Sequence, residues 1–489
     1  MSSAHEIETK FVEAAVAAFR LEFAAAIRQM RDAVCPSTFA DAERELHRLT
    51  RAVANDVTRQ VLQDLSDDAE TRERAAEEVR KKASAKAIQM RKERDRETEV
   101  RTLGGQHIRV KTPYMRALPR GGGAQVRGGQ GTGVYPVLDM LGILGRSTPA
   151  LRLQVAHAVA EANSVTSARE VLAKGGTEID HKAALRLTYL VCDDALRARE
   201  RAMKATSVGN EDGEFIGLRV AVGVDGGRVN IRRRVAGRPK KGGRKHFVSE
   251  WREPKVLTVY ALGDNGERDK RHRVVLDGTL GDADKVFRLL TYHLLRLGVH
   301  RAEQVVFLGD GAKWIWNRTD RLRQALGLST DRFFEVLDYF HAVERLTKLA
   351  SDKTRWSTEQ RSAWVDEQKT RLMDGDVDAV AEAAVSMVKH RKSEREKEAS
   401  YWARNHDRAR YALVRDANLP IGSGAVESAV RRVVNLRMKS ASVLWTEEHA
   451  EGILHLRAQS KAGRWEELES WVLQQTGWRP TARRTPKAA

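Results

Sequence analysis

The spacing of apolar residues predicts helices at the N-terminal end of the chain. Phe11, Ala15 and Phe19 fall on one helical face, and Leu46 and Leu49 begin a second. Apolar side chains three or four residues apart line one side of a helix, and that side needs a packing partner. We therefore predict helices over residues 6 to 66. The charge-dense stretch up to residue 101 favours a solvated helix, with a connector or a dimerising coil as alternatives.

The pattern changes twice before residue 210. Polar and apolar residues alternate around Gly104 and Gly105, which predicts a hairpin. Residues 120 to 133 are rich in Gly and Arg, a composition typical of a flexible basic loop. Helical spacing returns from residue 137 to 205, with a break at Gly175-Gly176. Two short helices across a glycine turn fit helix-turn-helix geometry, although such pairs also occur as plain packing units.

From residue 217 the pattern predicts a sheet with covering helices. The stretches GLRVAVGVDGG, RVNIRRR and KVLTVYALGDNG read as a strand meander, and HRVVLDGTL reads as a strand or loop. A helix (DADKVFRLLTYHLLRLG), a strand (QVVFLGDG), a further helix and the strand RFFEVLDYF follow. Unbroken apolar runs such as VVFLG are typical of buried parallel strands. Three meandering strands followed by helix, strand, helix and strand is the ribonuclease-H-like order.

We therefore predict a multidomain protein. Its α/β core has a ribonuclease-H-like mixed sheet with helices, accompanied by an all-α N-terminal region and an all-α insertion. The expected segments are a helical N-terminal region with a charged helix (1–100), a basic hairpin and Gly-rich loop (101–135), a helical, helix-turn-helix-like DNA-binding segment (136–210), the first part of the core (211–350), an all-helical insertion (351–418), the completion of the core with a glutamate-bearing helix (419–475), and a basic tail (476–489).

The chain is strongly basic. Lys and Arg number 86 against 67 Asp and Glu, which gives a net charge of +19 and a pI near 10. Such a charge favours a polyanionic partner, because binding releases condensed counterions. No apolar run approaches the roughly 18 residues of a membrane-spanning helix, and the N-terminal segment lacks a signal-peptide core. We therefore expect nucleic acid, and no membrane, as the partner.

Cysteine usage indicates the cellular compartment. Only Cys35 and Cys192 occur, too few for a disulfide framework or a cysteine zinc site. We expect both to be buried small hydrophobic residues, in a protein that works in a reducing, cytoplasmic compartment.

Three acidic residues stand in separate, motif-like settings. Asp225 follows the apolar run AVGV, Asp310 follows VVFLG, and Glu427 lies in the first turn of a predicted helix after GSG. Carboxylates at strand ends or a helix start suit Mg²⁺, which takes few protein ligands and keeps waters. Two such ions can clamp an in-line phosphoryl displacement. Singly, the three residues also fit a hairpin turn, a helix cap and a favourable charge at a helix N-terminus; the predicted strand order makes them one site.

Two groups of basic residues are expected to contact DNA. One follows Asp225 along the chain, where a phosphate-binding loop is favoured over a solvated charged face. The other lies on or after the helix of Glu427. The expected contacts are Arg232, Arg233, Arg234, Arg238, Lys240, Lys241, Arg244, Lys245, Arg431, Arg432, Arg437 and Lys439.

Four stretches in a fixed order carry a resemblance to a known family. VDGGRV, FLGDGAKWIW, LDYFHAVERL and GSGAVESAVRRVVNLRMK resemble motifs of DDE transposases of bacterial insertion sequences, closest to the ISKra-like group, over roughly residues 135 to 470. The resemblance implies that Asp225, Asp310 and Glu427 are catalytic and bind the metals. It extends to Asp338 and His341 as an accessory D-x-x-H element, in which His341 contacts phosphate, orients a carboxylate or is simply structural.

The expected function is therefore that of a DNA transposase. It would bind element ends, cleave DNA and join the 3′ end to target DNA by two-metal-ion phosphoryl transfer. Mg²⁺ is the expected cofactor, with Mn²⁺ able to substitute. Zinc is not expected, because the Gly-rich loop stands where relatives often carry a cysteine-bearing segment.

The expected partners are double-stranded DNA, namely terminal inverted repeats and target DNA, and further copies of the chain in a homodimer or higher homo-oligomer. A bacterial, cytoplasmic, nucleoid-associated location would follow. Two alternatives stay open: a non-catalytic DNA-binding regulator derived from a transposase, and a ribonuclease-H-like nuclease without strand transfer.

Overall fold

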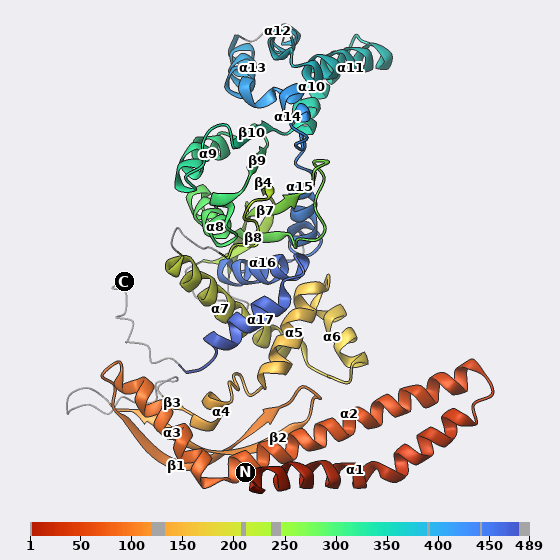
Figure 1. Cartoon of the computed structure of the whole chain (residues 1–489), viewed down its shortest axis with the longest axis vertical. Helices are drawn as coiled ribbons and strands as arrows, with labels where there is room; N and C mark the ends of the chain where they lie inside the picture. Colours follow the sequence, from red (N-terminus) through yellow and green to blue (C-terminus); the bar gives the residue numbers. More distant parts are fainter. Residues whose placement is uncertain are drawn as a thin grey trace. The chain divides into compact units, whose positions relative to one another are not determined.

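The structure is a computed structural model that describes residues 2–118, 133–206, 212–235, 246–388, 392–440 and 443–478. It is a mixed α/β protein (Figure 1). The chain divides into two compact units, residues 1–194 with 469–489 and residues 195–468. Most of the expected Gly-rich loop, the basic stretch at 236–245 and nearly all of the basic tail lie outside the described residues. Within the described ranges, no helix combines the length and apolarity that a membrane crossing requires.

The first unit begins with helices and continues into a small antiparallel sheet of order β1-β2-β3. Its core contains Val100, Ile108, Val110 and Val137. Its elements are α1 (Ser2–Arg31), α2 (Pro36–Asp67), α3 (Ala69–Ser84), β1 (Met90–Arg101), β2 (His107–Ala117), β3 (Gly133–Val134), α4 (Pro136–Met140), α5 (Pro149–Glu161), α6 (Val165–Lys174) and α7 (His181–Ala205), the last of which runs into the second unit.

Two expectations for the N-terminal region are wrong. The charge-dense stretch is not helical to residue 100, because α3 ends at Ser84 and β1 occupies Met90–Arg101. Sheet pairing overrides helix propensity there, since β1 pairs with β2 along the predicted hairpin on both sides of an irregularity between Lys92 and Asp95. Cys35 is exposed, unlike the buried Cys192. The predicted helix pair before and after Gly175-Gly176 is present as α6 and α7.

The second unit is built on a five-stranded sheet of order β10-β9-β4-β7-β8. Strand β4 pairs antiparallel with β7 and parallel with β9, and β9 pairs parallel with β10. The strands of this unit are β4 (Arg219–Gly226), β5 (Val229–Arg234), β6 (Phe247–Arg252), β7 (Lys255–Leu262), β8 (Val275–Thr279), β9 (Gln304–Gly309) and β10 (Phe333–Leu337).

Helices cover both faces of this sheet, and a helical insertion follows β10 (Figure 1). Among the described residues, every secondary-structure element between β10 and α15 is a helix, as expected for an all-helical insertion. The helices are α8 (Ala283–Arg296), η1 (Val299–Arg301), α9 (Lys313–Ala325), α10 (Tyr339–Ser351), α11 (Thr358–Asp374), α12 (Val377–Met387), α13 (Lys392–Asn405), η2 (His406–Ala409), α14 (Tyr411–Asp416), α15 (Gly424–Val430), the π-helical turn η3 (Arg431–Asn435), α16 (Glu447–Lys461) and α17 (Trp465–Gln475), the last of which runs into the first unit.

The expected strand meander is partly wrong. RVNIRRR forms β5, which pairs with β6 in a separate two-stranded sheet and contributes nothing to the five-stranded one. The second core strand is β7, and the third is β8 within HRVVLDGTL, the stretch read as a strand or loop. The physical reason is that the chain does not reverse at Gly226-Gly227: Gly226 pairs with Lys255 and Val229 pairs with Arg252, so β5 and β6 lie beyond the ends of β4 and β7.

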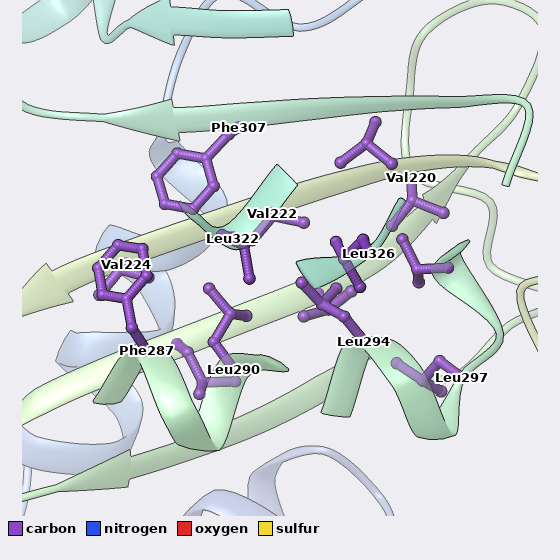
Figure 2. Close-up of a cluster of buried hydrophobic side chains, with 14 of the residues drawn as sticks. Val220, Val222, Val224, Phe287, Leu290, Leu294, Leu297, Phe307, Leu322 and Leu326 are labelled. Atoms are coloured by element: carbon purple, nitrogen blue, oxygen red, sulfur yellow. The ribbon is translucent and has the colours of Figure 1, made fainter. Parts of the chain in front are cut away.

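The two faces of β4 have different neighbours. Val220, Val222 and Val224 point into the main apolar core, where Phe287 of α8 and Phe307 of β9 also lie (Figure 2). Side chains alternate along a strand, so Asp225 points to the other face. Helix α15 covers that face closely: a Cβ added to Gly223 would lie 3.2 Å from Cβ of Val426.

Candidate active site

Three aspartates end three neighbouring parallel strands in one row. The β4 and β9 register pairs Gly223 with Leu308, so two residues further on Asp225 comes level with Asp310. The β9 and β10 register pairs Gly309 with Leu337, which brings Asp338 level with Asp310. Level side chains of parallel strands share a face. The sheet therefore presents all three carboxylates on the face that carries α15.

Asp225 and Asp310 are partly buried carboxylates with spare acceptor capacity. Within the described residues, Asp225 accepts only the N–H of Gly226 (2.6 Å), and Asp310 accepts only the N–H of Ala312 (3.1 Å). Burial, together with the charges of Asp310 and Glu427, raises the pKa of Asp225 to about 6. Burial also raises the pKa of Asp310. The charge of His341 offsets this accumulation of negative charge only in part, and a bound divalent ion would relieve the remainder.

Glu427 reaches the same place from the first turn of α15. The helix begins after Ser423, and its Val426 and Val430 are buried against the sheet, which leaves the neighbouring Glu427 half-exposed at the surface. Its carboxylate contributes to the field that raises the pKa of Asp225. The structure therefore brings the expected Asp225, Asp310 and Glu427 into one electrostatic site.

Asp338 has a different character from the other aspartates. It is fully buried and accepts the N–H groups of Phe340 (2.6 Å) and His341 (3.1 Å) at the start of α10. Its other oxygen accepts the N–H of Ser423 (2.7 Å) and the Ser423 hydroxyl. Burial acts to raise its pKa, but the hydrogen bonds from His341 and Ser423 outweigh it and lower the pKa to about 2. Its lone pairs are largely occupied.

His341 lies between Asp338 and Glu427. Its Nδ1 is 3.3 Å from Oδ2 of Asp338 and 3.7 Å from Oε1 of Glu427. The interaction with Asp338 raises the pKa of His341 to about 9, with further contributions from Asp310 and Glu427. In the metal-free protein the imidazole is therefore a cation at neutral pH, and a metal could bind the ring only by displacing its proton.

Two overlapping groups of side chains offer candidate metal ligands, and both include Glu427. Among the described residues, Asp338, His341 and Glu427 have ligand atoms within 4.8 Å of one another. In that cluster Asp338 is already hydrogen-bonded at both oxygens, and a metal would compete with the proton of His341. Asp225, Asp310 and Glu427 do not come within 4.8 Å of one another as a group among the described residues, but they offer hard carboxylate oxygens of the kind that Mg²⁺ and Mn²⁺ bind.

Two residues near the site were missed by the sequence pattern. Ser423 ties the start of α15 to Asp338, and the GSG stretch before the glutamate helix was the available signal. The charge of Glu253, between β6 and β7, helps to raise the pKa of Asp310. No motif marks Glu253; only the pairing of β4 with β7 places it near Gly226.

The helical insertion packs against the loop that carries Asp310. The ring of Tyr401 in α13 lies so close to Gly311 that an added Cβ would be 2.3 Å from its Cε2. The guanidinium of Arg408 stacks over Trp316 at 4.6 Å, and the Trp316 indole N–H donates to the Asp310 carbonyl (3.0 Å). These contacts fix the backbone next to the carboxylate.

The expected DNA contacts divide into three groups. Arg238, Lys240, Lys241, Arg244 and Lys245 lie outside the described residues, as does the side chain of Arg234. Arg232, Arg233, Arg431 and Lys439 are exposed, and Arg432 is intermediate. Arg437 departs from the expectation, because it is only 7% exposed and lies over Trp445 at 5.2 Å. Its packing role in the fold removes it from a DNA-facing surface.

Comparison with known proteins adds no relative to these observations. No family model matches the chain, no curated protein is similar to it, and no solved structure matches it. The function is therefore argued from the site itself.

Proposed function

We propose that the protein is a DNA transposase that cleaves DNA and joins the freed 3′ end to target DNA. The observation that carries the proposal is the row of Asp225 and Asp310 at the ends of neighbouring parallel strands, with Glu427 above them on α15. The strand order supports a ribonuclease-H-like core, because three antiparallel strands are followed by two parallel ones on the far side of β4. The net charge of +19 supports double-stranded DNA as the substrate.

Asp225, Asp310 and Glu427 would hold Mg²⁺, or Mn²⁺ in its place. When bound, such ions supply Lewis-acid stabilisation of the phosphate and activation of the attacking oxygen. The chain's own contribution is to hold the carboxylates rigidly. Asp338 fixes the start of both α10 and α15, and the protonated His341 adds a positive charge facing the phosphate region.

The proposed reaction has two balanced steps. In the first, a water oxygen bonds to phosphorus and the bond to the 3′ oxygen breaks, which leaves a 5′ phosphate and a 3′ hydroxyl. The proton lost by the water equals the proton gained by the leaving oxygen. In the second, the 3′ oxygen bonds to a target phosphorus and displaces the target 3′ oxygen. One carboxylate site serves both steps, since each is an in-line displacement at a phosphodiester.

Asp225→Asn provides the test. The substitution keeps the shape of the side chain and removes the charge, so we expect metal-dependent cleavage to be abolished while gel-shift binding of DNA is retained. Glu396→Asn, at an exposed position of α13, is the control. Retained cleavage by Asp225→Asn would contradict the assignment. Supplying precleaved ends and a target plasmid then separates a transposase, which joins them, from a nuclease, which does not.

A further inference from the structure

The two-stranded sheet of β5 and β6 has two faces of different chemistry. Its register pairs Asn230 with Trp251 and Arg232 with Ser249. Directly opposed side chains of an antiparallel pair lie on the same face. The Trp251 face therefore carries Asn230, Arg232, Phe247, Ser249 and Trp251, and the Val248 face carries Val229, Ile231, Arg233, Val248, Glu250 and Arg252.

Aromatic rings are exposed on the Trp251 face alone. Trp251 is 51% exposed and Phe247 is 47% exposed. They are four residues apart on one strand, hence about 13 Å apart at 3.3 Å per residue. Large rings left in water are unusual and mark interaction surfaces. The exposed apolar residue of the opposite face is the aliphatic Val248, at 55%.

The two faces also differ in charge: the basic residues of the Val248 face have acidic partners, and the exposed Arg232 of the Trp251 face has none among the described residues. On the Val248 face, Arg233 pairs with Glu250 (2.8 Å), and Arg252 lies near Glu250 (3.4 Å) and Glu447 (3.6 Å). On the Trp251 face, Arg232 is exposed, and within the described residues its guanidinium has no acidic partner. An uncompensated guanidinium between two exposed rings is complementary to a phosphate flanked by bases.

The two-stranded sheet of β5 and β6 begins close to the candidate active site along the chain. Asp225 pairs with Val256 on β7, and four residues further along the chain Val229 pairs with Arg252. Asn230, opposite Trp251, is five residues beyond Asp225, so the two lie at most about 17 Å apart along the strand. Five is an odd number of residues, so the Trp251 face is turned away from the face that carries Asp225, and a DNA strand leaving the site would reach it around the edge of the two-stranded sheet.

We propose that the Trp251 face binds unpaired nucleotides of a DNA strand next to the cleavage point. Bases would stack on Trp251 and Phe247, and a phosphate would contact Arg232. This inference rests on the proposed function and names a feature of its substrate. Unpaired bases are favoured over duplex, because base faces in a duplex are covered by their neighbours. The face's own charge favours a polyanion over a second copy as the occupant, because the exposed Arg232 would meet no carboxylate on an identical face.

The test measures binding of a labelled oligothymidylate to the full chain by fluorescence anisotropy in EDTA. We expect Trp251→Ala and Phe247→Ala each to weaken binding by about 5- to 150-fold, the effect of losing one stacked base. Trp251→Phe should restore most of the affinity, since it keeps a ring. Val248→Ala is the matched control on the opposite face, because Val248 is 55% exposed and Trp251 is 51% exposed. An abasic strand of equal length should not distinguish wild type from Trp251→Ala.

Other outcomes have defined meanings. Equal losses of affinity for Trp251→Ala and Val248→Ala would overturn the inference about the Trp251 face, and so would undiminished binding of the abasic strand. If duplex binding and metal-dependent cleavage persist in that case, the proposed function still stands. A change of mass in light scattering for Trp251→Ala without DNA would identify a second copy as the occupant and would also overturn the inference about the Trp251 face. Failure of the wild type to bind any DNA would instead remove the proposed function.

Discussion

At the scale of single residues, two aspartates at equivalent positions in the sheet have different chemical environments. Asp310 and Asp338 are level with each other at the ends of β9 and β10. Asp310 keeps acceptor capacity and has a raised pKa, whereas Asp338 is saturated by donors and has a pKa lowered to about 2. The difference arises because α10 and Ser423 converge on Asp338. We infer that Asp338 is a positioning residue, whereas Asp310 keeps acceptor capacity for a ligand.

Metal binding should depend on pH through Asp225. Its carboxyl has a pKa of about 6 in the metal-free protein, and the protonated form cannot ligate a cation. Protons therefore compete with Mg²⁺ below pH 6, and we expect the affinity for Mg²⁺ to fall by up to about tenfold per pH unit there. Above pH 6 this group is already ionised and adds no further dependence. Isothermal titration calorimetry across this range measures the effect.

Asp225→Asn is the control for this dependence. The amide does not titrate, so the variant should bind Mg²⁺ weakly and lose the part of the pH dependence that Asp225 contributes. Wild-type affinity that stays flat as the pH falls through 6 would show that Asp225 does not ligate the ion.

The residues of the site were accessible from the sequence to different degrees. Asp225 and Asp310 were predictable as a neighbouring pair, because each follows an unbroken apolar run typical of a buried strand. The saturation of Asp338 was not, because it depends on Ser423, which is 85 residues away along the chain. The burial of Arg437 was also hidden, since its place over Trp445 is a tertiary contact.

At the scale of elements, strand identity was harder to predict than strand existence. The sequence of β5, VNIRRR, reads as a strand that follows β4 directly. The strand nevertheless lies beyond the end of β7 and pairs with β6. The burial of all five residues of β8 shows why it belongs in the sheet, although its sequence contains Asp277. Asp277 is paired with Arg199 (3.1 Å), His293 (3.0 Å) and His455 (2.9 Å). These partners come from other elements, so the local sequence pattern does not predict them.

The attachment of α13 to α10 yields a prediction about stability. Glu398 is 5% exposed and accepts from Arg345 Nε (2.9 Å) and from the Trp402 indole N–H (2.9 Å). Arg345 in turn stacks over Tyr401 at 3.9 Å. Glu398→Ala leaves both donors unpaired, so we expect a loss of about 1–3 kcal/mol of stability. Thermal unfolding followed by circular dichroism measures it.

The same variant should impair the site through Tyr401. The ring packs against Gly311, next to Asp310, so a displaced α13 loosens the backbone that holds this carboxylate. We expect slower metal-dependent cleavage in Glu398→Ala than in Glu396→Ala, an exposed position on the same helix. Identical melting temperatures for the two variants would show that the buried pair does not anchor the insertion.

At the scale of the whole molecule, charge is the property that most limits the choice of partner. The chain has 86 basic and 67 acidic residues, which gives a net charge of +19. Acidic residues nevertheless gather at the strand ends, where Asp225, Asp310 and Glu427 repel one another. A basic chain with an acidic site would suit a polyanion that is cut in the presence of divalent cations, because the cations would reverse the local charge only where the chemistry occurs.

Binding of duplex DNA should therefore weaken steeply with salt. Each phosphate neutralised by Lys or Arg releases condensed counterions, so six to ten contacts would cost about 10³- to 10⁵-fold in affinity between about 50 and 200 mM salt. Gel shifts of Asp225→Asn in EDTA measure this without cleavage. Arg431→Ala, at an exposed position four residues beyond Glu427, should reduce the logarithmic slope by about one. Affinity independent of salt would contradict a phosphate-dominated interface, whatever the metal site does.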